Sequence, residues 1–400
     1  GVAATALVAL VGFAAAMGWQ AQRISVERGR AEWVSSFLTE LFLAADPDEA
    51  RGNVVTAKDL LDRGAERIET ELGGDPVLRG RVMTMLGRTY VGLGEYDDAA
   101  RMLERAVAIQ RDALGPYDRA TVAALHNLAL VTWEMGRYEE AEALYREAVE
   151  AGTRGLGETD PQTLVSMGNL ANAYVTTGRF AEAETLSARV LEARRRVRGT
   201  DHLETLVAAG DLAMVRQNLG RLDEAEELFR QTLADMERVL GKDSPHTLRT
   251  QYNLGLVLNQ MRRYGEADVY YGDALKGMRT VLGEDHPNTL FVMVGAAMNL
   301  ANQQRFSEAE PMLGEALEGQ RRVLGASHPS TLATVYNLGC LAALKGDRAL
   351  ALEWLRQAVR DGYANAEWMA QDSDLESLHG DPEFEEIVAR LREEAVTGRG

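Results

Sequence analysis

Apolar and polar positions follow helical spacing through most of the chain. In residues 157–198, a first apolar stripe with three-and-four spacing consists of Leu164, Met167, Leu170, Ala171 and Tyr174. A second stripe follows after Gly178 and consists of Ala183, Leu186, Val190 and Leu191. Such spacing is typical of α-helices with one apolar face. The stretch therefore predicts a pair of helices.

The same pair recurs with a period of 42 residues, and the rows align without a gap from Leu114 onward. A glycine ends each row, a threonine follows six residues later, and an alanine marks a close approach of two helices. The glycines are Gly115, Gly157, Gly199, Gly241, Gly283 and Gly325; the threonines are Thr121, Thr163, Thr205, Thr247, Thr289 and Thr331; the alanines are Ala141, Ala183, Ala225, Ala267, Ala309 and Ala351. A period of roughly 20 to 50 residues indicates a solenoid, whose stacked units bury faces that none can bury alone.

The motif LGEDHPNTL, from Leu282 to Leu290, returns as LGASHPSTL from Leu324 to Leu332. We expect Gly283 to end one helix in a left-handed conformation. Asp285 or His286 is then expected to cap the next helix, with Pro287 in its first turn. His202, His286 and His328 share the cap position. Because a whole repeat separates successive histidines, capping is favoured over the alternative of a ladder of metal ligands.

These patterns predict an all-α, right-handed superhelical solenoid of about seven helix pairs. The predicted rows are 73–114, 115–156, 157–198, 199–240, 241–282, 283–324 and 325–366. Residues 21–72 are expected to form juxtamembrane helices and an N-terminal cap, with a capping box of Thr56 and Asp59. Residues 367–400 are expected to form capping helices and a tail that cover the last repeat through Leu375, Leu378, Phe384, Ile387 and Leu391.

Residues 2–19 carry no charge. As a helix they measure about 27 Å, close to the ~30 Å hydrocarbon core of a bilayer. We therefore expect a transmembrane helix over residues 1–20 and a single-pass membrane protein. A signal peptide and a buried core helix are the alternatives. Arg23, Arg28 and Arg30 favour a cytoplasmic location for the residues that follow the helix.

Charge and missing motifs narrow the function. The chain has 61 acidic and 43 basic residues, a net charge of −18 that opposes binding to nucleic acid. Cys340 is the only cysteine, so an intrachain disulfide and a thiolate metal cage are excluded, and its expected role is in the core. The strings typical of kinases, P-loop proteins, hydrolases and zinc proteases are absent. We expect no catalytic residue, no metal and no cofactor.

Two stretches carry a family resemblance: HNLALVTWEMGRYEEAEALYREAVE, from His126 to Glu150, and YNLGLVLNQMRRYGEADVYYGDAL, from Tyr252 to Leu275. They resemble the tetratricopeptide repeats of kinesin light chains in the Asn-Leu-Ala/Gly triplet, the Gly-Arg-Tyr turn and the Leu-Gly-x-x-His-Pro linker. The segment from Glu27 to Leu72 looks like the junction before the repeats in bacterial transmembrane serine/threonine kinases. That order implies a kinase domain before Gly1 and places the repeats outside the cytoplasm, opposite to the side that the arginines favour.

The resemblance implies a concave groove on helix A of each pair, with one polar column pointing into it. This column contains Asn127, Asn169, Asp211, Asn253 and Asn337, with Gly295 in the same register. A carboxamide is both donor and acceptor, so a row of them can bind the backbone of an extended peptide; bonds between neighbouring helices are the alternative. Further groove candidates are Trp133, Glu134, Asn172, Asn218, Gln260, Asn302, His126, Tyr252 and Tyr336.

The sequence therefore predicts a membrane-anchored module that binds a protein or an extended peptide in the groove, with no nucleic acid and no small-molecule cofactor. The resemblance implies that this module is the sensory or scaffolding part of a bacterial serine/threonine kinase. A stand-alone anchored scaffold is the alternative, and an enzyme with its active site in these residues is disfavoured.

Overall fold

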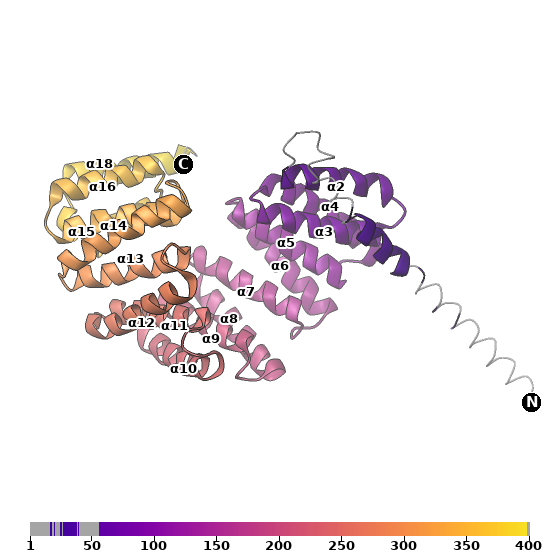
Figure 1. The fold of residues 1–400 in the computed structure, drawn as a ribbon, viewed down its shortest axis with the longest axis horizontal. Helices are drawn as coiled ribbons and strands as arrows, with labels where there is room; N and C mark the ends of the chain where they lie inside the picture. Colours follow the sequence, from indigo (N-terminus) through magenta and orange to yellow (C-terminus); the bar gives the residue numbers. More distant parts are fainter. Residues whose placement is uncertain are drawn as a thin grey trace, which may run out of the picture. The chain divides into compact units, whose positions relative to one another are not determined.

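The computed structural model describes residues 56–397, together with Met17, Gln20, Ser25, residues 27–37 and Thr39. Within these residues the ordered elements are all helices, as the periodicity predicts, and no strand is present. The chain divides into two compact units, Gly1–Thr177 and Gly178–Gly400 (Figure 1). The division falls in the turn after one of the predicted helices A.

The first unit contains three helices A and the helices that separate them. Its helices are α2 (Ala57–Glu71), α3 (Pro76–Gly92), α4 (Tyr96–Leu114), α5 (Arg119–Glu134), α6 (Tyr138–Gly155) and α7 (Pro161–Thr176). Each helix from α3 onward packs on the next, and helix A also touches helix A, α3 on α5 and α5 on α7. The apolar stripes of successive pairs thus share one core.

The start of the first unit is covered by the helical residues 27–37. Phe37 is fully buried in one cluster with Ile68 and Leu78. The Arg30 guanidinium donates to the Asp75 carboxylate, with a distance of 2.7 Å between Nε and Oδ2. The capping box that the sequence predicts from Thr56 and Asp59 is present at the start of α2.

The second unit continues the same alternation and ends in a cap. Its helices are α8 (Phe180–Arg198), α9 (Leu203–Asn218), α10 (Leu222–Leu240), α11 (Pro245–Gln260), α12 (Tyr264–Leu282), α13 (Pro287–Asn302), α14 (Phe306–Val323), α15 (Pro329–Leu344), α16 (Arg348–Asp361), α17 (Ala366–Gln371), η1 (Ser373–Leu378) and α18 (Pro382–Thr397). The helices A are α9, α11, α13 and α15. The residues expected to cover the last repeat, such as Leu375 and Phe384, are buried in one cluster with α15 and α16.

The repeated sequence marks correspond to repeated local structure. His286 caps α13 by accepting from the Asn288 backbone N–H at 3.1 Å, and His202 and His328 cap their helices in the same way, which confirms the predicted capping. Gly283 has a φ of 94°, a region that favours glycine, but its ψ of 166° lies outside the left-handed helical conformation that was expected. The Thr247 hydroxyl donates to the Gly241 carbonyl at 2.8 Å, and Thr121, Thr205 and Thr331 make the same bond, which accounts for the six-residue spacing in these four repeats.

The single-pass membrane location is wrong on the evidence of the described residues. None of their helices combines the length and the apolar composition that a bilayer crossing requires. Each of the long helices presents a polar face as well as an apolar one, as packing in a solenoid demands. The predicted span, residues 2–19, lies outside the described residues except for Met17.

Candidate functional site

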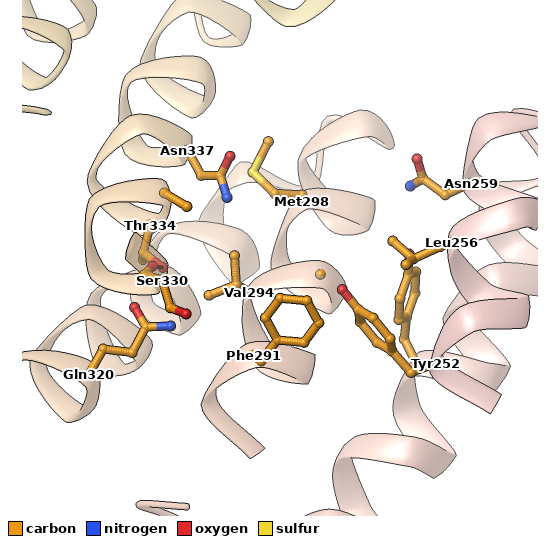
Figure 2. Close-up of a pocket in the computed structure, with 13 residues that line it drawn as sticks. Tyr252, Leu256, Asn259, Phe291, Val294, Met298, Gln320, Ser330, Thr334 and Asn337 are labelled. Carbon is orange, nitrogen blue, oxygen red and sulfur yellow. Dashed lines mark hydrogen bonds between the residues drawn. The ribbon is translucent and has the colours of Figure 1, made fainter. Parts of the chain in front are cut away.

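The helices A of the second unit lie side by side, α9 against α11, α11 against α13, and α13 against α15. Two cavities open along this row. The larger, about 510 Å³, lies between α9, α11 and α13, and the smaller, about 240 Å³, lies between α11, α13 and α15 (Figure 2). Both are lined by Tyr252, Leu256 and Phe291. We call the two cavities and the residues that line them the trough.

The smaller cavity depends on a glycine in the polar column. Gly295 stands where other repeats carry asparagine or aspartate, and a Cβ at this position would lie 2.6 Å from Cε2 of the Tyr252 ring. The ring therefore occupies the space that a side chain at 295 would need. Tyr252 also packs on Phe291, with 5.2 Å between the ring centroids, and on Tyr271 at 5.6 Å.

Phe291 stands between the two cavities and lines both. Its side chain is 51% exposed, although it is a large apolar residue on a packed helix A. Figure 2 shows its ring between Tyr252 on one side and Gln320 and Ser330 on the other. An exposed aromatic ring beside two hollows is a typical anchor for a partner side chain.

The smaller cavity is lined without any charged residue. Its polar lining residues are Tyr252, Asn259, Tyr271, Gln320, Ser330, Thr334 and Asn337. Asn259 is satisfied by Asn299, with a donation at 2.8 Å. Gln320, on helix B α14, is only 1% exposed, and its Oε1 has no hydrogen-bond partner among the described residues. A buried carboxamide without a partner costs about 1 to 3 kcal/mol, so the site favours a ligand that supplies one.

The larger cavity has charges at its edge and sulfur on its floor. Met236 and Met278 project from helices B, and Asp211, His246 and Arg249 come from helices A. Burial raises the pKa of the Asp211 carboxyl, although Arg249 and Arg194 act in the opposite direction. Burial and the nearby Arg249 lower the pKa of His246. Arg249 is therefore the cation of this cavity at neutral pH.

The predicted asparagine column divides between the two units. In the first unit, Asn127 donates to the Ala123 carbonyl of its own helix at 2.8 Å, and Asn169 hydrogen-bonds to the Tyr145 hydroxyl. In the second unit, Asn253 and Asn337 are half-buried and line the larger and the smaller cavity respectively. The hydrogen bonds recorded for the described residues include none from these two side chains.

The remaining groove candidates have varied surroundings. Within the trough, the structure brings together Tyr252, Asn253, Asn337 and Asp211. The other candidates lie outside the trough and have partners of their own. His126 is 3.1 Å from the Ser166 hydroxyl, and Trp133 packs on Tyr138. Asn218 donates to the Met214 carbonyl of its own helix, Asn302 donates to Asn259, and Tyr336 donates to Asp372. Asn172 and Gln260 are exposed, as is Glu134.

Sequence reasoning missed two residues of the trough. Gln320 lies on helix B, where no groove residue was expected. Phe291 occupies a column whose other members are Arg81, Ala123, Val165, Val207, Arg249 and Ala333. The residues that locate this site in the sequence are those that differ from the repeat pattern, not those that follow it. Gly295 in an asparagine column is the mark that could have located the hollow.

Comparisons with known proteins agree with this architecture. A family model described as tetratricopeptide repeat matches residues 43–112, 120–196, 169–237, 204–280, 246–321 and 289–361, and a second with the same description matches residues 84–155. The chain belongs to the tetratricopeptide repeat family. Members of this family are protein-binding modules, and the fold is typically non-catalytic. A search of curated proteins found no match.

Several solved structures are similar to this tetratricopeptide chain. A putative kinesin light chain from Podosopora anserina is 27% identical and covers 50% of this chain and 96% of that chain, with a TM-score of 0.46. A Rap protein complexed with competence and sporulation factor is 12% identical and covers 92% of this chain and 99% of that chain, with a TM-score of 0.60. The Rap conjugation gene regulator of plasmid pLS20, in complex with the Phr* peptide, is 15% identical, covers 84% and 94%, and has a TM-score of 0.56. The two Rap structures share the fold.

Proposed function

We propose that this tetratricopeptide array is a scaffold that binds an extended segment of a partner protein in the trough of its second unit. One observation carries the proposal: polar groups without partners surround the apolar trough. They are the Tyr252 hydroxyl and the carboxamides of Asn253, Gln320 and Asn337, for which no hydrogen bond is recorded among the described residues, whereas Asn127 and Asn169 of the first unit have internal partners. Unsatisfied groups on helices A favour a ligand with its own donors and acceptors.

The arrangement assigns different tasks to different residues. Asn253 and Asn337 are placed to bind backbone groups of the peptide, since a carboxamide can donate to a carbonyl and accept from an N–H. The two cavities are placed to receive side chains, with Phe291 between them. Successive residues on one face of an extended chain are about 7 Å apart. Because the two cavities share Tyr252, Leu256 and Phe291, they adjoin, and we expect one extended segment to place a side chain in each.

The link to a serine/threonine kinase stays a prediction. It rests on the resemblance of the segment from Glu27 to Leu72 and concerns a domain outside this chain. Peptide binding in the trough does not depend on it, because every group named above lies between α9 and α15.

The proposal is tested by selecting short random peptides, displayed on phage, on the whole chain and then measuring the affinity of a synthetic winner by calorimetry. Phe291→Ala combined with Asn253→Ala is expected to weaken binding at least tenfold, with an unchanged circular dichroism spectrum. Recovery of no peptide, or of peptides whose affinity ignores both substitutions, would show that the trough is not a binding site.

A further inference from the structure

The floor of the trough differs from the same position elsewhere in the array. Gln320 belongs to a column on helices B that contains Gln110, Gly152, Arg194, Met236 and Met278. Gln110 and Gln320 are the two glutamines in this column, so they allow a comparison at one register. Both are 1% exposed.

The two glutamines have different surroundings. The Gln110 amide donates to the Thr84 hydroxyl, with 3.2 Å between Nε2 and Oγ1. The residue in register with Thr84 near Gln320 is Val294, which lines the same cavity and can neither donate nor accept. No hydrogen bond to the Gln320 side chain is recorded among the described residues. Oε1 has no partner among the described residues in either glutamine. The two differ at Nε2, because the hydroxyl that accepts from Nε2 in the first repeat is absent from the sixth.

The cavity above Gln320 has room for a ligand group. Its volume of about 240 Å³ exceeds the roughly 150 Å³ that suffices for a benzene ring in an engineered protein cavity. Val294, Met298 and Phe291 supply apolar walls, and Gly295 leaves room for the Tyr252 ring at the edge of the cavity. The Tyr252 hydroxyl, on a ring that is 6% exposed, is also without a recorded partner.

The chemistry of the floor selects among side chains. A charged group is disfavoured, because no residue that lines the cavity can pair with it and its desolvation is costly. A hydroxyl engages only one end of the Gln320 amide at a time. Oε1 is buried as the structure places it, so a ligand meets Nε2 first. A second carboxamide accepts from Nε2 and, once the Gln320 amide turns its oxygen toward the cavity, also donates to Oε1, so it satisfies both ends. A glutamine stem is one methylene longer than an asparagine stem and reaches deeper toward the floor.

We infer that the smaller cavity of the trough takes the side chain of a glutamine in the bound peptide, whose carboxamide pairs with that of Gln320. This assignment rests on the peptide binding proposed above and adds the identity of one anchor. The apolar walls contact the methylene groups of the peptide's glutamine, and the Gln320 amide forms hydrogen bonds with the carboxamide of that glutamine. The preference for glutamine arises because leucine leaves Gln320 without a partner.

The experiment uses the whole chain and peptides selected from the random library. A winner that contains glutamine is synthesised together with its Gln→Leu, Gln→Glu and Gln→Tyr versions, and each is titrated by calorimetry. The Gln→Leu peptide loses two hydrogen bonds to Gln320, so we expect the chain to prefer glutamine over leucine by roughly 10- to 30-fold. Gln320→Met is expected to abolish that preference, and Gln110→Met, the matched control, is expected to preserve it.

A second variant tests the pairing without removing the amide. Val294→Thr supplies the hydroxyl that Thr84 offers to Gln110, with little change in volume. The Gln320 amide then has an internal partner, and the preference for glutamine is expected to fall below about threefold. A rise in the unfolding temperature of this variant would show that the new bond forms.

The outcomes separate the two claims. Failure to select any peptide would overturn the binding function and this inference together. Selected peptides that bind in the trough but lack glutamine, or tolerate Gln→Leu, would overturn the inference alone. A preference for glutamine that survives Gln320→Met would also overturn it.

Discussion

The two units use one repeat in different ways. In the first unit, Nε2 of Gln110 donates to Thr84, Asn127 donates to its own helix, and His126 contacts Ser166, although Oε1 of Gln110 and the Thr163 hydroxyl have no partner among the described residues. In the second unit, Gln320, Asn253 and Asn337 have no recorded partner and line two cavities. The repeat therefore specifies the fold in both units, and departures from it create the site in one.

The largest expected effect is on the stability of the first unit. A Cβ on Gly155 would lie 2.0 Å from the Tyr117 carbonyl oxygen, so Gly155→Ala should lower the free energy of unfolding by about 2 to 3 kcal/mol. The same register in the second unit holds the exposed Val239. Val239→Ala, measured by urea unfolding, should change stability by less than about 0.5 kcal/mol. Equal effects of the two substitutions would mean that the close approach is not special to the first unit.

Next in size is the contribution of Phe291 to peptide binding. Phe291→Ala removes the exposed ring between the cavities and should weaken a selected peptide by about 2 kcal/mol. Val165 occupies the same column in the first unit and is 41% exposed. Val165→Ala is the matched control and should leave the affinity unchanged when both are titrated by calorimetry. A similar loss from both variants contradicts a site confined to the second unit.

The units should also respond to acid in opposite directions. Burial lowers the pKa of His126 to about 4. The stability that the neutral imidazole contributes is therefore fully present above the unfolded pKa of about 6.5 and is lost as the pH falls toward 4. At pH 5 the loss amounts to about 1 to 2 kcal/mol. Burial and the adjacent Asp372 raise the pKa of Asp374 to about 6. Stability at the C-terminal cap is therefore greatest below about pH 4 and is lost as the pH rises through 6, by at most about 3 kcal/mol.

Hydrogen exchange at two pH values separates these contributions. Acidification from pH 7 to pH 5 should increase exchange in α5 and reduce it in η1. His126→Phe should remove the first response, and Asp374→Asn the second. If either response persists in its own variant, another group is responsible for it.

The smallest effect is expected from the asparagine column. Asn253→Ala and Asn337→Ala should each weaken the peptide by about 1 kcal/mol, the value of one hydrogen bond. Asn127→Ala and Asn169→Ala, whose amides are engaged in the first unit, should not change the affinity. Calorimetry with one peptide and the four variants compares the units directly. Losses from all four substitutions would indicate a groove that includes both units.

The sequence predicted what local chemistry determines. The sequence predicted the helix pairs, the histidine caps and the burial of Ala141 and its counterparts. These features follow from residue spacing, turn glycines and capping residues, all of which can be recognised within a short stretch of sequence. The contact between Tyr252 and Gly295 was not predicted, because it depends on the ring of the preceding helix A entering the space of the missing side chain. The membrane location was wrong, because it rested on hydropathy and length alone.

The central claim is that the second unit holds the binding site, and methionine methyl groups report on it directly. Met214, Met236, Met278 and Met298 line the trough, whereas Met83, Met102 and Met167 are buried in the first unit. The chain is labelled with ¹³C at its methionine methyl groups and titrated with a selected peptide. The resonances of the four trough methionines should shift, and those of the three methionines in the first unit should not. Shifts confined to Met83, Met102 and Met167 would contradict the account.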